Sequence, residues 1–528
     1  MNILFATAEL KGLVSVGGLA EVAASLSHCL RKQGHDVRIA MPFYASLRDQ
    51  QHLSDKLEAV WQGKIDDTDW PPAKMYSTTF HHKNEHIPLL LVRGHEWFEH
   101  ANSRFTIYPD ESMAQPYFFF AATVLAFLQY GNYNWQPDII HCHDYHTGLI
   151  TVYLHKKYNG EIHGQRVGTV FTIHNLSFQG ICSRDILAES GLPASLGAYS
   201  AGMDSMEFYD KLNCMKGALV FSDMTSTVSE TYAHEIQLPD HGHGLHGVLN
   251  LLSQEGRLHG IMNGIDTELW NPARLPKEYA YSMYDLSGKA KAKKQLQEMA
   301  GLEISSEPVI AIRSRWAYQK GLELLLMALR YYAFYEQAQF IIVSRHPGRV
   351  DPDYLGLWYE LKGWAQDYPQ RIAVLSNKHI TSGLHYAGSD MVLMPSLFEP
   401  CGLTQLEAMC YGTVPIVRQT GGLRDTIGED VGFSFHWDFK EPLDLSQKRI
   451  GAWEMIKTIA NALSEFRQPD MWTCRVINAL TQEHHWMKRV TEYERLYRLA
   501  LKRIGRKMNS PISQESTISE GVLSQALV

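Results

Sequence analysis

The chain has 528 residues and a mass of 60.1 kDa, which exceeds a single hydrophobic core and predicts roughly two to four domains. Hydrophobic residues make up 45% and the formal net charge is −8, which indicates a globular protein and excludes a protein that coats nucleic acid. Seven scattered cysteines without a CxxC pair favour a reducing compartment over a disulfide scaffold or a Cys-rich zinc site.

The chain shows no secretory signal at its start. Its most apolar stretch, Tyr117–Leu128, is shorter than the ~20 residues that a membrane span requires, so we expect a buried helix there. These features predict a soluble cytoplasmic protein without a membrane partner.

Short apolar runs alternate with helix-compatible segments along the first half of the chain. Ile3–Ala6 leads through a Gly-Gly pair into an apolar stripe of helical spacing from Leu19 to Leu30, and Val37–Met41 follows. This strand, glycine loop, helix and strand predict a parallel sheet. Further strands are expected at Leu89–Val92, Ile139–His143, Val167–His174 and Met224–Val228.

A second series of the same kind begins near Pro308, and its first helix is expected from Leu322 to Leu329. Its strands are expected at Val309–Ile312, Phe340–Val343, Ile372–Leu375, Met391–Met394 and Val414–Val417. Two such series predict an α/β protein with two doubly wound domains that face each other across a cleft, where ligands bind beyond the carboxyl ends of the strands. The join lies around 271–306, and residues 509–528 are expected to form a disordered tail.

Two polar patches follow expected strands of the first domain. Gly17 and Gly18 stand at a helix start, where backbone amides can approach a phosphate, although a Gly-Gly turn also occurs for structural reasons alone. In the run His141–His146, strand alternation places His141 and His143 on one face. A metal site would need three converging ligands, so hydrogen bonding is the favoured interpretation.

Two other segments superficially suggest metal binding. The run His241–Gly244 is interpreted as a flexible loop, and Asp351–Asp353 as part of a turn. No metal site is therefore predicted.

Two further patches follow expected strands of the second domain. Arg315 and Lys320 lie at a strand–loop–helix junction, where two cations can converge on a diphosphate; a solvated surface pair is the alternative. The segment Pro395–Gln405 holds Glu399 between two prolines beside a helix start, which suits binding of sugar hydroxyls. The glycines of Thr420–Leu423 form a second place where the backbone can approach a ligand closely. Alternatively, these prolines and glycines only shape the corner between strand and helix.

In combination, these motifs resemble the bacterial glycogen synthase and plant starch synthase family from Met1 to about Arg498. The matching segments are Gly17–Ala20, His143-Asp144, Thr172–Gly180, Met262–Pro272, Ser314-Arg315, Gln319–Gly321, Phe398–Gln405 and Tyr411–Arg418. The resemblance implies the GT-B fold, with two Rossmann-like domains and a C-terminal helix, near Trp486–Tyr497, that returns to the first domain. The implied division is 1–270 for the catalytic domain on the acceptor side, 271–306 for a linker, 307–475 for the nucleotide-sugar domain, 476–508 for the returning helix and 509–528 for the tail.

The resemblance also implies an activity, namely retaining transfer of glucose from ADP-glucose to the non-reducing 4-hydroxyl of an α-1,4-glucan such as glycogen, without a metal or cofactor. Arg315 and Lys320 would neutralise the departing diphosphate, Glu399 would orient the glucose, and His174 would contact it from the first domain. The implied substrate-binding positions are Ser15, Gly17, Gly18, Glu21, Asp144, Asn263, Cys401, Gly402, Leu403, Thr420, Gly421 and Gly422. Closure of the two domains would exclude water.

Four positions depart from the usual pattern of this family. Ser15 stands where Lys is usual, Glu21 where Asp is usual, Leu397 where Arg is usual, and Asn377 at the place of an aromatic residue. Loss of one cation that faces the donor costs ~1–3 kcal/mol of binding. An active synthase is favoured; the alternatives are a glucan-binding or regulatory paralogue with weakened catalysis, and a synthase that uses a different nucleotide-sugar donor.

Overall fold

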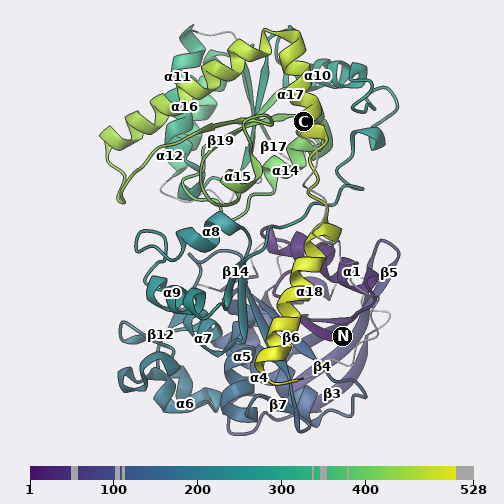
Figure 1. Ribbon diagram of the computed structural model, residues 1–528, viewed down its shortest axis with the longest axis vertical. Coiled ribbons are helices and arrows are strands. Elements are labelled where there is room, and N and C mark those ends of the chain that lie inside the picture. Colours follow the sequence, from purple (N-terminus) through teal and green to yellow (C-terminus); the bar gives the residue numbers. More distant parts are fainter. Residues whose placement is uncertain are drawn as a thin grey trace, which may run out of the picture.

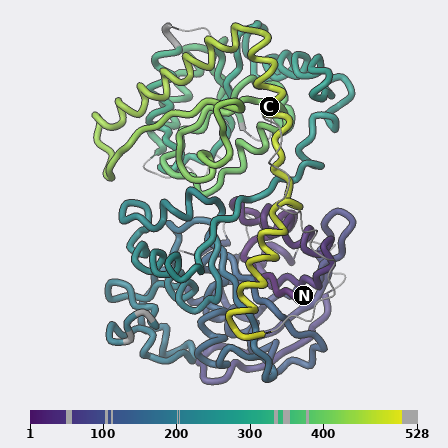
Figure 2. Tube along the Cα trace, viewed as in Figure 1, coloured from purple at the N-terminus to yellow at the C-terminus, as the bar shows by residue number. Residues whose placement is uncertain are grey.

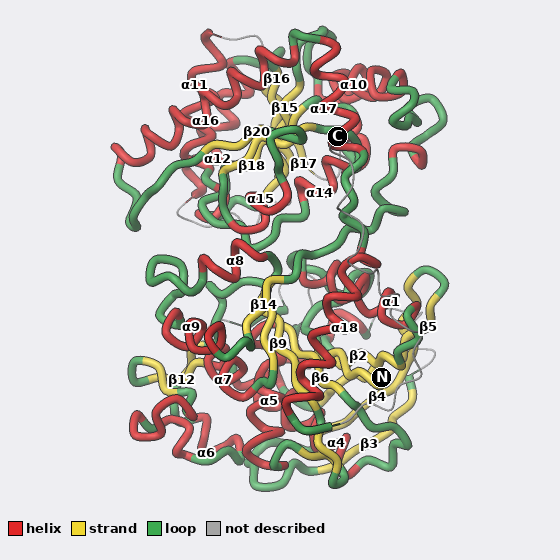
Figure 3. The backbone as a smooth tube through the Cα atoms, in the orientation of Figure 1, coloured by secondary structure: helices red, strands yellow, loops and turns green. Residues whose placement is uncertain are grey.

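The computed structural model consists of two lobes, each built around its own β-sheet (Figure 1). In Figure 3 the strands run through the middle of each lobe and helices surround them. The structure describes residues 1–48, 57–101, 107–109, 113–335, 338–344, 354–376 and 380–506.

The first lobe contains a nine-stranded sheet in the order β14-β13-β9-β6-β1-β2-β5-β4-β3. Its strands are β1 Asn2–Ala6, β2 Asp36–Pro42, β3 Glu58–Gly63, β4 Ala73–His82, β5 Glu85–Arg93, β6 Ile139–His143, β9 Gly168–Ile173, β13 Met224–Thr227 and β14 Leu258–Gly260. The six strands predicted from apolar runs are confirmed, and they pair in parallel. Three strands were not predicted: the short edge strand β14, and β3 and β4, which add an antiparallel edge to the sheet. Strand β4 alternates buried with partly exposed side chains and β3 buries none, so neither forms an apolar run.

The second lobe contains a six-stranded, fully parallel sheet in the order β17-β16-β15-β18-β19-β20. Its strands are β15 Val309–Ser314, β16 Gln339–Ser344, β17 Ile372–Ser376, β18 Met391–Met394, β19 Val414–Arg418 and β20 Phe433–Phe435. The five predicted strands are confirmed. In both sheets the order reverses beside the first strand, between β1 and β6 and between β15 and β18, so the two lobes are doubly wound as expected.

Helices flank both sheets. They are α1 Leu19–Lys32, α3 Glu96–His100, α4 Gln115–Tyr130, α5 Asp144–Tyr158, α6 Ile186–Ser190, α7 Cys214–Phe221, α8 Glu230–Glu235, α9 His246–Gln254, α10 Ser287–Ala300, α11 Leu322–Tyr335, α12 Leu355–Asp367, α13 Ser382–Ala387, α14 Thr404–Met409, α15 Gly421–Thr426, α16 Leu445–Phe466, α17 Pro469–Leu480 and α18 Trp486–Arg503. Helix α4 is the expected buried helix, since Pro116–Leu128 are buried on every side. Among the described helices, none combines the length and hydropathy needed to cross a bilayer.

The chain passes from the first lobe to the second in teal and returns to the first in yellow, as Figure 2 shows. Helix α17 contains the expected boundary at residue 475, and its Val476 packs in the second-lobe core. Helix α18 packs on the first lobe, where Val490, Tyr493 and Tyr497 are fully buried. The predicted returning helix is therefore present, and the buried side chains on one of its faces explain why it docks there.

Candidate active site

The four polar patches all lie at the topological switch points of the two sheets, where the strand order reverses between β1 and β6 and between β15 and β18. Gly17 and Gly18 follow β1, and Asp144 follows β6, which are the strands on either side of the first switch point. Lys320 follows β15 and Glu399 follows β18, which flank the second. Because ligands of such sheets bind outside the carboxyl ends at the switch point, the fold gathers these residues where a ligand site is expected.

The second-lobe centre is a pair of opposite charges. Lys320 Nζ lies 2.5 Å from Glu399 Oε2, and Ser396 Oγ donates to the same oxygen over 2.9 Å. The Glu399 side chain is only 9% exposed, so these two partners, and not water, stabilise its negative charge. The structure thus brings Lys320 together with Glu399, whereas the sequence predicted that Lys320 and Arg315 converge on a diphosphate.

Two loops are tied together around this pair. Gln319 Nε2 donates to the carbonyl of Phe398 over 3.0 Å, and the Leu397 amide donates to the carbonyl of Gln319 over 2.8 Å. Arg315, which is exposed, donates to Gln319 Oε1 over 3.4 Å. These bonds fix the register between the loop that carries the two cations and the loop that carries Glu399.

Gly421 lets a third loop approach Glu399. Its φ is +43°, and a Cβ at this position would clash with the carbonyl oxygen of Glu399. The amide of Gly422 donates to that same carbonyl over 3.1 Å. The glycine pair predicted to approach the sugar therefore supports the backbone of Glu399 directly.

Glu235 of α8 reaches across from the first lobe to this loop. Its Oε1 accepts from Thr420 Oγ1 over 3.1 Å and from the Gly421 amide over 3.0 Å. Ser229 Oγ adds a hydrogen bond of 2.6 Å to the carbonyl of Pro400. The Thr420 hydroxyl and the Gly421 amide therefore both donate hydrogen bonds to a first-lobe carboxylate and form part of the contact between the lobes.

The first-lobe glycine loop also has an internal partner. Glu9, which is 3% exposed, accepts from the amides of Val16 and Gly17 over 2.6 and 2.9 Å. Gly18 faces the second lobe, since a Cβ there would lie 3.5 Å from Leu403 Cδ1. The lobes therefore meet at Gly18 and Leu403, two of the predicted binding positions.

Ser15 is exposed on this loop, and Lys11 does not take its place. The Lys11 ammonium forms an ion pair with Glu21 in the first turn of α1. Lys11 also lines a cavity of about 430 Å³ whose other wall includes Asp266 and Arg274 of the segment that joins the lobes. The cation of Lys11 is therefore directed to Glu21 and to this cavity.

Asp144 lies at the start of α5 in the left-handed region, with a φ of +54°. Its Oδ1 accepts from the amides of His174 and Asn175 over 2.7 and 3.4 Å. Burial raises the pKa of Asp144 to about 7, and the hydrogen bond from the His174 amide opposes this rise. His143 Nδ1 lies 2.9 Å from His174 Nε2, and burial lowers the pKa of His174 to about 3. At neutral pH His174 is therefore an uncharged hydrogen-bonding group.

Asp144→Asn is expected to remove a pH dependence of folding. The carboxyl has a folded pKa of about 7 and an ordinary value of 3.8, so the folded state binds the extra proton and stability falls as pH rises through 7. Asn keeps the acceptor oxygen and tolerates positive φ. The free energy of unfolding of wild type relative to the variant should fall by about 2 kcal/mol between pH 5 and 7.5, measured by urea denaturation. Parallel pH profiles of the two proteins would contradict this.

The histidines of β6 are structural. His141 and His143 share a face, as predicted, with ring centroids 4.1 Å apart. His141 lies 2.9 Å from the Tyr497 hydroxyl of α18 and 2.7 Å from Thr172 Oγ1. Within the part of the chain that the structure describes, no group of three His, Cys, Asp or Glu side chains converges as metal ligands would.

Asn263 and Cys401 meet where the lobes join. Both are buried, and Cys401 packs in a small apolar cluster with Val228 and Met262 of the first lobe. Burial raises the pKa of the Cys401 thiol to about 12, which a hydrogen bond with Asn263 opposes. Asn263 thus contributes to the junction at which it was expected to line the cleft.

Sequence reasoning missed Glu9, Glu235 and His243. Glu9 follows the first apolar strand after two residues, which is a usable signal, whereas nothing near Glu235 indicates its partner 185 residues away. His243 was interpreted as part of a flexible loop; instead its carbonyl accepts from Gln179 Nε2 over 3.1 Å, and its ring lies 6.5 Å from that of Phe398. These contacts between segments distant in sequence order that loop.

Of the positions that depart from the family's pattern, Leu397 can be located in the structure and Asn377 cannot. Leu397 is 2% exposed and packs in the second-lobe core. Asn377 lies outside the described residues, as do Asp351–Asp353 and the tail 509–528.

Comparison with known proteins agrees with this geometry. A starch synthase catalytic domain model matches residues 2–251, and a group 1 glycosyl transferase model matches residues 294–448. A glycogen synthase of Geotalea uraniireducens is 37% identical over 526 residues, covering 96% of this chain and 100% of that protein. The chain belongs to the glycogen synthase family.

Other members of the glycogen synthase family are similarly close. Glycogen synthase 2 of Geobacter sulfurreducens is 37% identical over 517 residues, covering 95% of this chain and 99% of that protein. The catalytic domain of starch synthase IV from Arabidopsis thaliana, solved with ADP and acarbose, is 29% identical with a TM-score of 0.78, covering 95% of this chain and 99% of that one. The expected GT-B fold and the assignment as a hexosyltransferase are confirmed.

Proposed function

We propose that this glycogen synthase transfers glucose from ADP-glucose to the non-reducing 4-hydroxyl of an α-1,4-glucan, with retention of configuration and without a metal or cofactor. The observation that carries the proposal is the pair of Lys320 and Glu399 at the switch point of the second lobe. The relatives named glycogen synthase and the neighbour solved with ADP and acarbose support this donor and acceptor. We place the reaction in the cytoplasm, which the seven free cysteines support.

The second lobe supplies the charges for bond cleavage. As the glucosyl group separates from the diphosphate, negative charge grows on the phosphate oxygens. Lys320 and Arg315 stabilise that charge, and the carboxylate of Glu399 binds sugar hydroxyls. Thr420, Gly421 and Gly422, with Cys401, Gly402 and Leu403, shape the loops around the sugar and phosphates.

The first lobe supplies neutral hydrogen-bonding groups for the sugars. His174 is uncharged at neutral pH and suits recognition of a glucose hydroxyl, which carries no charge to match a cation. Asp144 lies on the acceptor side, hydrogen-bonded to the His174 amide. Gly18 and Leu403 are in contact where the lobes meet, so this contact would border the donor phosphates on one side. Asn263 would line the same cleft.

A donor panel tests the proposal. Purified protein is incubated with glycogen and with labelled ADP-, UDP- or GDP-glucose, and label in the polymer is counted. We expect incorporation from ADP-glucose to exceed that from the other donors by about tenfold or more. No incorporation with retained glycogen binding would instead identify a paralogue with weakened catalysis, and higher incorporation from another nucleotide would identify a different donor.

Ser15→Lys is expected to improve donor binding. Ser15 is exposed on the loop that faces the second lobe, so a lysine there adds a cation near the phosphates without displacing buried atoms. We expect the KM for ADP-glucose to fall by about fivefold to tenfold at unchanged kcat. Ser15→Gln adds length without charge and should leave KM within about twofold of wild type. Unchanged kinetics in the lysine variant would mean that this loop does not contact the donor.

A further inference from the structure

Arg313 is the next-to-last residue of β15, the central strand that borders the switch point of the second lobe. Its side chain is half-buried, and its Nη1 is fully buried without a hydrogen-bond partner. Among the residues that the structure describes, Arg313 forms no hydrogen bond and no ion pair. A guanidinium that leaves water without gaining an acceptor lowers the stability of the fold. Arg313 therefore needs an explanation other than folding.

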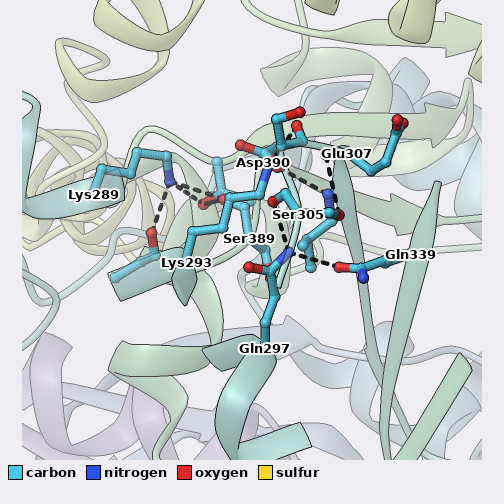
Figure 4. A network of polar contacts seen from close by, with 12 residues as sticks. Lys289, Lys293, Gln297, Ser305, Glu307, Gln339, Ser389 and Asp390 are labelled. Carbon is cyan, nitrogen blue, oxygen red and sulfur yellow. Dashed lines mark hydrogen bonds and ion pairs between the residues drawn. The ribbon is translucent and has the colours of Figure 1, made fainter. Parts of the chain in front are cut away.

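Two lysines near the opposite end of β15 show how this lobe accommodates cations that serve the fold. Lys289 donates to the carbonyl of Ser389 over 2.9 Å, and Lys293 Nζ lies 2.7 Å from Asp390 Oδ2 (Figure 4). The same carboxylate oxygen accepts from the amide of the first residue of β15 over 2.8 Å. Each of these cations has a protein acceptor, which distinguishes them from Arg313.

Arg313 lines a narrow pocket together with Lys320, Ser396 and Thr404. Lys320 and Ser396 both contact Glu399 Oε2, so the pocket adjoins the pair at the centre of the candidate site. Thr404 is the first residue of α14, which follows the loop that carries Glu399. A phosphate group bound by Lys320 would therefore lie near the guanidinium of Arg313.

The titratable groups that Arg313 faces on α13 and α14 do not neutralise it. Glu407 accepts a hydrogen bond of 2.8 Å from the Tyr386 hydroxyl. Burial, and after it the charge of Arg313, lowers the pKa of His385 to about 3, so this histidine is uncharged at neutral pH. An anionic ligand in the pocket would thus meet a guanidinium that gives up no described partner to bind it.

We propose that Arg313 is a further donor-binding residue, whose guanidinium binds a phosphate group of the nucleotide sugar beside Lys320. The inference rests on the proposed function, because it takes a nucleotide diphosphate sugar as the donor. A guanidinium presents parallel N–H groups that match two phosphate oxygens, whereas the ammonium of Lys320 is a point charge. The two cations would therefore bind the diphosphate in different ways.

Calorimetric titration of the full-length protein with ADP tests the role of Arg313, and urea denaturation without nucleotide measures stability. Arg313→Met keeps most of the side-chain length but removes the charge, and we expect its Kd for ADP to rise by about tenfold or more. Without nucleotide the variant should be at least as stable as wild type, because it removes a desolvated charge that lacks a partner.

Arg330→Met is the matched control. Arg330 forms an ion pair with Glu360 in the same lobe, and 57% of its side chain is exposed. Its Kd for ADP should stay within about twofold of wild type.

Two further variants separate charge from hydrogen bonding. Arg313→Lys keeps the charge, whereas Arg313→Gln keeps N–H donors without charge. We expect Arg313→Lys to bind ADP at least about threefold more tightly than Arg313→Gln, because the bound group is an anion. Wild-type affinity in Arg313→Gln would overturn the assignment to a phosphate.

The remaining outcomes distinguish this inference from the proposed function. Wild-type protein that binds no ADP would contradict the proposed function and the inference with it. Equal Kd values for ADP in wild type and Arg313→Met would overturn the role of Arg313 alone. A clear loss of stability of Arg313→Met without nucleotide would assign Arg313 to the fold and would also overturn the inference.

Discussion

Lys320→Ala is expected to lower kcat by about 10²–10³-fold, the size of effect seen when one preorganised group that stabilises transition-state charge is removed. The lysine is 16% exposed and lies 2.5 Å from Glu399, so the substitution removes a positioned cation and leaves Glu399 with Ser396 as its side-chain partner. Initial rates with ADP-glucose and glycogen measure the loss, and thermal unfolding establishes that the variant is folded.

Lys448→Ala is the matched control for this variant. Lys448 also pairs with a carboxylate in the second lobe, Glu323, at 2.6 Å and with 22% of its side chain exposed. Loss of such a partly exposed ion pair costs about 1 kcal/mol or less, and kcat should stay within about twofold of wild type. A near-normal kcat in Lys320→Ala would remove the lysine from the mechanism.

A double variant separates two roles of Lys320. If it acts mainly by holding Glu399, then Lys320→Ala combined with Glu399→Gln should be no slower than the slower single variant. If Lys320 also stabilises the leaving diphosphate, the double variant should be slower than either by at least about tenfold. We expect the second result, because Arg315 and Lys320 share the loop that follows β15.

Gly421→Ala is expected to lower both stability and kcat. The added methyl group would meet the carbonyl oxygen of Glu399, and the φ of +43° is unfavourable for a residue with a Cβ. The free energy of unfolding should fall by about 2 kcal/mol. The forced shift of Glu399 should lower kcat by about 10²-fold, as misplacement by about 1 Å does at other sites. Urea denaturation and initial rates measure the two effects.

Gly363→Ala shows what the same substitution does without a clash. Gly363 lies in α12, and a Cβ there would meet nothing within 4 Å. Alanine favours helix by about 1 kcal/mol over glycine, so this variant should be as stable as wild type or more so, at unchanged kcat. Equal stabilities of the two alanine variants would show that the loop at Gly421 relaxes freely.

The candidate site was predictable to the extent that it depends on local pattern. Lys320 and Glu399 each lie in the loop that follows an apolar strand, and parallel strands bring such loops to one edge of a sheet. The place of Glu9 just after the first apolar strand was a usable signal for a polar site, but it did not indicate its bonds to the Val16 and Gly17 amides. Glu235 has no local pattern that reveals its partner. Glu235 bonds to a loop of the other lobe, which depends on how two separately folded sheets come together.

Local pattern along the chain is enough to predict the two doubly wound sheets, because buried parallel strands must be apolar runs and their helices must carry apolar stripes. The same pattern shows which loops carry charge at the ends of those strands. Three features follow from the three-dimensional packing instead: β3 and β4 extend the first sheet, Lys11 pairs with Glu21 and does not replace the cation absent at Ser15, and Gly18 meets Leu403. These contacts join residues far apart in the chain or turn a side chain one way among several, so the packing of whole elements decides them and local pattern does not.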